Sequence, residues 1–124
     1  MAQKEILILG NPELWKISEK VVNPGAVDGL IADLSDTLAS FREANGFGRA
    51  IAAPQIGIHQ RVIYTSLFGG LPLINPVISE ASEELFELWD DCFSLPDLMV
   101  RVRRHNSITV SYLDRSGQSC QLKA

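Results

Sequence analysis

The clearest hydrophobic pattern in the chain is helical. Between Pro24 and Ala44 the apolar residues recur mostly at spacings of three or four positions, which places them on one face of a helix. Asn23 can cap the start of this helix, Pro24 suits a first helical position, and Gly46 can end it in a left-handed conformation. The pattern predicts one amphipathic helix near the N-terminus. Its apolar residues are Val27, Leu30, Ile31, Leu34, Leu38 and Phe41.

After this helix the spacing of apolar residues changes to two, which is typical of strands. Residues Arg61 to Thr65 and Leu71 to Leu73 predict two strands on either side of a turn at Gly69-Gly70. A third strand, Pro76 to Ser79, is predicted after a break at Asn75-Pro76, because proline cannot donate to a sheet ladder.

The last third of the chain predicts further strands. Glu84 to Trp89 is one, and the alternation from Val100 to Tyr112 predicts a hairpin with its turn near His105-Asn106. A second turn at Asp114 to Gly117 leads into a final strand, Ser119 to Lys123. One helix followed by antiparallel strands and hairpins gives an α+β class.

Length and composition indicate an ordinary globular chain. It has 124 residues, of which 46% are hydrophobic and 21% charged, which is enough for a single domain over residues 1–124. The apolar run Ile6 to Leu9 is too short for a signal peptide or a membrane span. Two cysteines are too few for a disulfide scaffold. We therefore expect a cytoplasmic protein with no membrane partner.

The charge pattern argues against a nucleic-acid partner. The formal net charge is -4, and the only dense basic cluster is Arg101, Arg103 and Arg104. Such a cluster lacks the broad positive footprint that nucleic-acid binding requires. Its alternation with apolar residues favours the solvated face of a strand.

Two segments carry a resemblance to a known family. They are Gly48-Arg-Ala-Ile-Ala-Ala-Pro-Gln-Ile-Gly57 and Asp90-Asp-Cys-Phe-Ser94. In this order and spacing they resemble the first two of the three signature motifs of peptide deformylases. Further matches follow as Cys-x-Ser-x-Pro from Cys92, Val-x-Arg from Val102 and Asp-x-x-Gly from Asp114. The resemblance implies a deformylase-like α+β fold.

On its own, Cys92 could be a small buried hydrophobic residue. The resemblance implies instead that Cys92 is a thiolate ligand of a divalent metal, Fe²⁺ in the family, with Zn²⁺ or Ni²⁺ as alternatives. The family's third motif, His-Glu-x-x-His, does not occur in the 124 residues; by the family's spacing it would begin roughly ten residues after Ala124. His59 and His105 are not spaced as helical metal ligands, so metal should bind weakly or not at all.

Gln55 has two interpretations as well. It can belong simply to a turn fixed by Pro54 and Gly57. The resemblance implies that its amide donates to the formyl oxygen, helped by the backbone N–H of Phe93, and two such donors form an oxyanion hole.

The resemblance also implies a substrate groove along the first motif, with two departures from the family's pattern. The family's pattern has a glycine at the position of Ala50 and a second glycine at the position of Asp91. Both changes add bulk next to the expected peptide. The expected substrate-binding residues are Arg49, Ala50, Ile51 and Asp91.

Two functions remain open. The first is that of a peptide deformylase, which hydrolyses the formyl group of N-formylmethionyl peptides. The second is that of a non-catalytic deformylase-like protein that binds peptides or a partner, or the remnant of a disrupted gene. Without the central metal-binding helix the chain is expected to be inactive alone and to expose part of its core, which a homo-oligomer would cover.

Overall fold

The structure, a computed structural model, describes residues 3–92 and 94–124. The predicted helix is present, but its first turn is a separate 3₁₀ helix, η2 (Pro24–Val27). The Asn23 side-chain oxygen caps this turn by accepting from the Gly25 N–H at 3.1 Å. The α-helix α1 then spans Asp28–Asn45, and Gly46 ends it at φ 77° with its N–H donating to Arg42 O at 2.8 Å.

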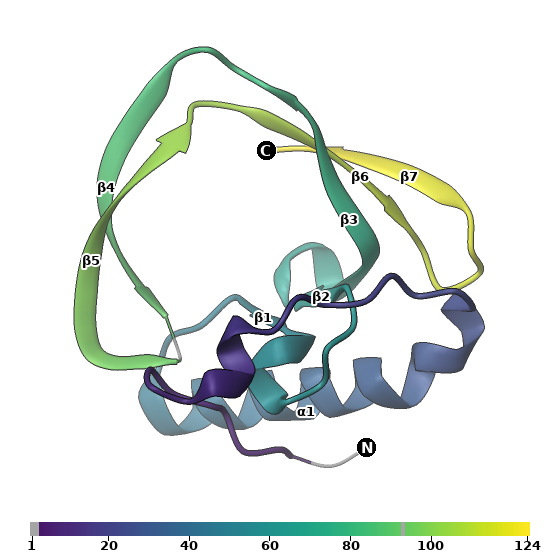
Figure 1. Ribbon diagram of the computed structural model, residues 1–124, viewed down its shortest axis with the longest axis horizontal. Helices are drawn as coiled ribbons and strands as arrows, with labels where there is room; N and C mark the ends of the chain where they lie inside the picture. Colours follow the sequence, from purple (N-terminus) through teal and green to yellow (C-terminus); the bar gives the residue numbers. More distant parts are fainter. Residues whose placement is uncertain (1–2, 93) are drawn as a thin grey trace.

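Strands of the described residues form two antiparallel sheets (Figure 1). The larger has the order β1-β2-β3-β6-β7, and the smaller is the hairpin β4-β5. In Figure 1 this hairpin lies on the opposite side of the molecule from β6 and β7, and α1 runs below β1 and β2. The strands are β1 (Ala50–Ala52), β2 (Val62–Thr65), β3 (Leu71–Ala81), β4 (Leu85–Cys92), β5 (Leu95–His105), β6 (Ile108–Leu113) and β7 (Ser119–Lys123). Three more 3₁₀ helices are η1 (Pro12–Trp15), η3 (Ala53–Ile56) and η4 (Leu67–Gly69).

The prediction of a hairpin from Val100 to Tyr112 is wrong. β5 pairs with β4, whereas β6 pairs with β3 and β7, so the two strands belong to different sheets. The backbone between them bonds to the segment before β4: Ser82 N donates to Ser107 O at 2.8 Å, and Asn106 N donates to Glu84 O at 2.9 Å. The alternation of apolar and polar residues along a strand does not show which other strand it will pair with.

The predicted break at Asn75-Pro76 is a bend within one strand. β3 continues through it, and its pairing with β6 shifts register between Ile74 and Val77. Asn75 has a φ of 51°, a conformation that asparagine tolerates better than most residues. Its side chain holds the N-terminal segment, because Oδ1 accepts from Val21 N at 2.7 Å and Nδ2 donates to Val21 O at 2.9 Å.

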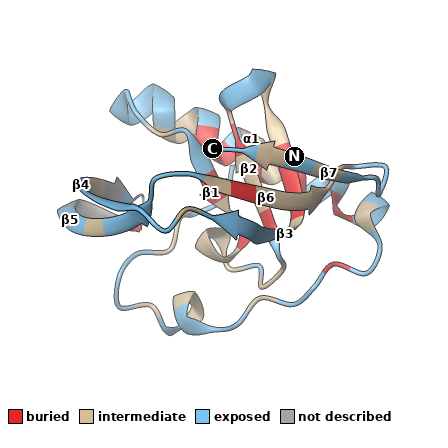
Figure 2. Cartoon of the chain, turned by 90° about the horizontal axis from the view of Figure 1, so that it is seen from above, coloured by how far each residue is buried: buried red, intermediate tan, exposed pale blue. Residues whose placement is uncertain are grey.

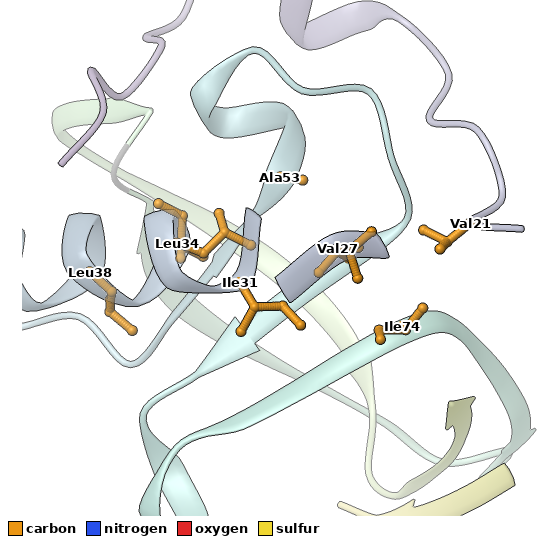
Figure 3. Packing of buried hydrophobic residues seen from close by; sticks show 9 residues of the cluster. Val21, Val27, Ile31, Leu34, Leu38, Ala53 and Ile74 are labelled. Atoms are coloured by element: carbon orange, nitrogen blue, oxygen red, sulfur yellow. The ribbon is translucent and has the colours of Figure 1, made fainter. Parts of the chain in front are cut away.

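The hydrophobic core lies between α1 and the first strands of the larger sheet. Ile31, Leu34 and Leu38 are at most 1% exposed, as the helical stripe predicts. Figure 2 shows the buried positions on and beside α1, with hairpin β4-β5 largely exposed. Figure 3 shows the cluster at close range, and its members are Val21, Val27, Ile31, Leu34, Leu38, Ile51, Ala53, Val62 and Ile74. No helix of the described chain has the length and apolar character needed to cross a membrane.

Candidate active site

Gln55 is held in one orientation by the turn that carries it. The turn η3 directly follows β1, and Gly57 closes it at φ 82°. The backbone N–H of Ala52 donates to Gln55 Oε1 at 2.9 Å. This donor identifies the oxygen side of the amide, so the Nε2 donors point the other way. There Nε2 lies 3.5 Å from Cys92 Sγ and 3.2 Å from Ser94 Oγ.

The N-terminal segment joins the two parts of this arrangement. Leu7 N donates to Gln55 O at 2.7 Å, and Leu9 N donates to Ser94 O at 2.7 Å. Residues 7 and 9 therefore hold the turn after β1 and the start of β5 at a fixed separation. The close approach of Gln55 and Cys92 does not depend on their own contact alone.

Cys92 is exposed, so its interpretation as a buried apolar residue is wrong. It is the last residue of β4 and pairs with Leu95 after a register shift that begins at Asp91. Such irregularities redirect side chains at the end of a strand. Phe93, whose N–H was the second expected donor, lies outside the described residues, as does the side chain of Asp91.

A cavity of about 410 Å³ adjoins Gln55 and Cys92. It brings together four of the expected site residues, because Arg49 and Ala50 also line it. Ile51 does not, since its side chain is 1% exposed and belongs to the core cluster. The lining residues are Arg42, Phe47, Gly48, Arg49, Ala50, Gln55, Ser66, Leu67, Asp90, Cys92 and Arg104.

Several residues near this cavity were not among the expected site residues, and three of them are Ser94, Arg104 and Arg42. Ser94 and Arg104 are fixed letters of the matched motifs, so the resemblance contained a signal for both. For Arg42 the sequence contained no such signal, because a charged residue on the polar face of an amphipathic helix normally faces solvent. Its place in the cavity follows from α1 ending next to the first motif.

Beside the cavity, β1 is an edge strand of its sheet. Ser66 N donates to Arg49 O at 2.9 Å, and bonded pairs alternate in an antiparallel ladder. The backbone groups of Ile51 therefore face β2, while those of Ala50 face the free edge. A free edge can accept an extended peptide through main-chain hydrogen bonds.

Comparison with known proteins identifies the family. The sequence model of the family described as polypeptide deformylase matches residues 3–124. The chain belongs to the peptide deformylase family. Peptide deformylase 2 of Clostridium perfringens is 36% identical over 121 residues, covering 95% of this chain and 75% of that protein. Peptide deformylase 2 of Vibrio cholerae is 36% identical over 128 residues, covering 99% and 73%.

Solved peptide deformylases have the same fold. The Thermotoga maritima enzyme matches with a TM-score of 0.89 and 26% identity, covering 99% of this chain and 82% of that one. The Legionella pneumophila enzyme matches with a TM-score of 0.89 and 30% identity, covering 99% and 72%. The predicted family and the α+β fold are confirmed.

Peptide deformylases are in general metal-dependent, so the residues present must be tested as ligands. Cys92 supplies one, whereas a hydrolytic site needs about three protein ligands. His59 Nε2 lies 2.9 Å from Glu13 O, and His105 Nδ1 lies 2.7 Å from Ser82 O, and neither lines the cavity. Among residues 3–92 and 94–124, no three His, Cys, Asp or Glu side chains form a group that could hold a metal. These residues by themselves do not fit the metal.

Proposed function

We propose that the described residues form the formyl-binding part of a peptide deformylase site, and that the 124 residues alone bind an N-formyl peptide without hydrolysing it. The orientation of Gln55 carries this proposal. Its amide oxygen accepts from Ala52 N at 2.9 Å, so its donors point toward the exposed thiol of Cys92, 3.5 Å away, and both side chains line the cavity. The free edge of β1 would hold the peptide backbone alongside.

The family's reaction adds water to the formyl carbon and releases formate, which leaves a free amine on the peptide. A neutral donor aimed at the formyl oxygen stabilises the developing negative charge, typically by a few kcal/mol of barrier. Gln55 would take this role, and Cys92 would supply one thiolate ligand for the family's Fe²⁺ or for Zn²⁺ or Ni²⁺. The remaining ligands and a general acid and base must come from groups other than the described residues.

The sharpest test uses Gln55→Glu, which keeps the oxygen that Ala52 N requires and removes the amide donors. Calorimetry would compare formyl-Met-Ala-Ser with the same peptide lacking the formyl group. We expect the native chain to bind the formylated peptide about fivefold more tightly, because one net hydrogen bond contributes about 1 kcal/mol. Gln55→Glu should lose this preference. The matched control is Gln118→Ala, because Gln118 uses only its backbone in the turn before β7.

Two results would contradict the proposal. One is an unchanged preference for the formyl group in Gln55→Glu. The other concerns turnover and is measured as formate release with added Fe²⁺ or Ni²⁺. We expect none from the 124-residue chain, so release that Cys92→Ala abolishes would show that this chain is a complete enzyme.

A second candidate function is that of a non-catalytic, oligomeric binding protein, and exposed apolar side chains favour it. Ile78 on β3 is 60% exposed and Phe86 on β4 is 41% exposed. Leu88 shares the face of Phe86, because alternate residues of a strand point the same way. We propose that a second copy of the chain covers these residues. Sedimentation should show a dimer at micromolar concentration that Phe86→Ser weakens, and a monomer would overturn this part.

A further inference from the structure

The cavity beside Gln55 has the opposite charge to the chain as a whole. The chain carries a formal net charge of -4, yet Arg42, Arg49 and Arg104 line the cavity with a single described acidic side chain, that of Asp90. Charges that line a concave site act through low-dielectric walls and are less screened than charges on an open surface. The balance among these four side chains therefore decides which ligands the cavity favours.

Among the described residues, only one of the three arginines has a carboxylate partner. Arg104 forms an ion pair with Asp90 across hairpin β4-β5. Arg42 Nη1 donates to Ser66 Oγ at 2.8 Å, a neutral acceptor that leaves the positive charge uncompensated. Arg49 is bonded through its backbone oxygen, which accepts from Ser66 N and Thr65 Oγ1 at 2.9 Å each. Among described residues, its guanidinium has no hydrogen-bond or ion-pair partner.

The other arginines of the same hairpin provide the comparison. Arg101 and Arg103 are more exposed, and both pair with Glu87 on the opposite strand. This part of the chain thus supplies carboxylates to arginines in open solvent. Among the described residues, Arg42 and Arg49 have no carboxylate partner, and both line the cavity.

We propose that Arg49, together with Arg42, selects peptides that carry an Asp or Glu side chain in the second or third position after the formyl group. The inference rests on the proposed function, because the free edge of β1 must align the peptide beside Ala50. Arg49 directly precedes Ala50, and both residues line the cavity beside this edge, so a peptide bound there would pass close to Arg49. A guanidinium can pair with a carboxylate through two parallel hydrogen bonds, which a lysine cannot match.

The test compares formyl-Met peptides that differ in one residue, Asp, Asn or Lys, placed second or third. Binding is measured by fluorescence anisotropy with dye-labelled peptides and the 124-residue chain, at low and at moderate salt. We expect the Asp peptide to bind about threefold to tenfold more tightly than its Asn counterpart, as for a partly screened ion pair. The Lys peptide should bind more weakly than both. Added salt should reduce the differences.

Three variants separate charge from shape. Arg49→Gln should remove most of the preference for Asp, and Arg49→Glu should reverse it in favour of Lys. Arg115→Gln is the matched control, because Arg115 is exposed in the turn between β6 and β7 and does not line the cavity. It should leave the preference unchanged.

The two proposals fail in distinguishable ways. Equal binding of the Asp, Asn and Lys peptides at both positions would overturn the selectivity and leave the formyl-binding function in place. A preference for Asp that survives in Arg49→Glu would overturn the role of Arg49. Failure of every formylated peptide to bind would overturn the function and the selectivity together.

Discussion

The half of the molecule built on α1 and the hairpin β4-β5 differ in how they are stabilised. The buried apolar side chains lie on α1, on β1 to β3 and on the segments around them. On the hairpin, by contrast, Leu85, Phe86, Trp89 and Met99 are all between 41% and 63% exposed. Packing against a core holds the first region, whereas strand pairing and exposed ion pairs hold the second.

The candidate site lies where these two regions meet. Gln55 belongs to a turn that packs against the core through Ala53, which is fully buried. Cys92 ends the exposed strand β4. The amide donor of Gln55 thus belongs to the well-packed region built on α1. The thiol of Cys92 belongs to the hairpin, whose conformation should respond first to a change in packing or association.

The largest expected difference between the two regions comes from the same substitution made in each. Leu34→Ala removes a side chain with 0% exposure and should cost about 2 to 5 kcal/mol of unfolding free energy. Leu85→Ala, at 48% exposure and on the opposite face of β4 from Phe86, should cost about 0.5 kcal/mol. Urea denaturation measures both. Similar costs would mean that the outer face of the hairpin is covered in solution.

A smaller effect is expected from the backbone at the two ends of α1. Gly46→Ala forces an alanine to φ 77° and should destabilise by about 1 to 2 kcal/mol. Gly29→Ala, within α1, should stabilise by about 0.4 to 1 kcal/mol by restricting the unfolded chain. A new Cβ meets nothing within 4 Å at either glycine, so contacts do not confuse the comparison. Thermal unfolding should shift in opposite directions, and shifts of the same sign would contradict the backbone explanation.

The smallest effect concerns a turn outside both regions. A hydrogen bond from the Ser116 hydroxyl, at 2.7 Å, is the main cause that keeps the pKa of Asp114 below its usual value. The backbone N–H of Gln118 adds a bond at 3.0 Å. Because the folded pKa is the lower one, this carboxylate stabilises the fold above the usual aspartate pKa of about 4, and the contribution is lost as pH falls through the folded value.

Asp114→Asn should therefore reduce the loss of folding stability at acidic pH. Melting temperatures of the variant and the native chain would be measured from about pH 6 down to about pH 2, a range that begins above the usual aspartate pKa of about 4 and continues below it. The native chain should lose more stability over this range than the variant. An equal loss in both proteins would show that Asp114 contributes nothing to the pH dependence.

The sequence predicted the packed region better than the exposed one, for a physical reason. The stripe through Ile31, Leu34 and Leu38 is dictated by burial on one face, so it shows in the spacing alone. β5 has no comparable burial among its described side chains, and its pairing with β4 rather than β6 depends on contacts distant in sequence. The wrong hairpin arose there.

The candidate site shows the same limit. Local spacing left Gln55 and Cys92 each with a structural interpretation, and only the family resemblance linked two residues that stand 37 positions apart. Arg42 was not predicted as a site residue, because its position on the polar face of the helix indicates contact with solvent. The fold instead brings it beside Ser66 and the cavity. Contacts between distant segments determine a site, and periodicity reports only on local structure.

The central claim is that the Gln55 amide donors face the place where a formyl oxygen binds. The most direct measurement follows the side-chain amide resonance of Gln55 by NMR, assigned from its disappearance in Gln55→Glu, during titration with formyl-Met-Ala-Ser and with the unformylated peptide. We expect this resonance to shift with the formylated peptide only, while the amide resonance of Gln118 stays unchanged. A formylated peptide that binds without moving the Gln55 resonance would contradict the claim.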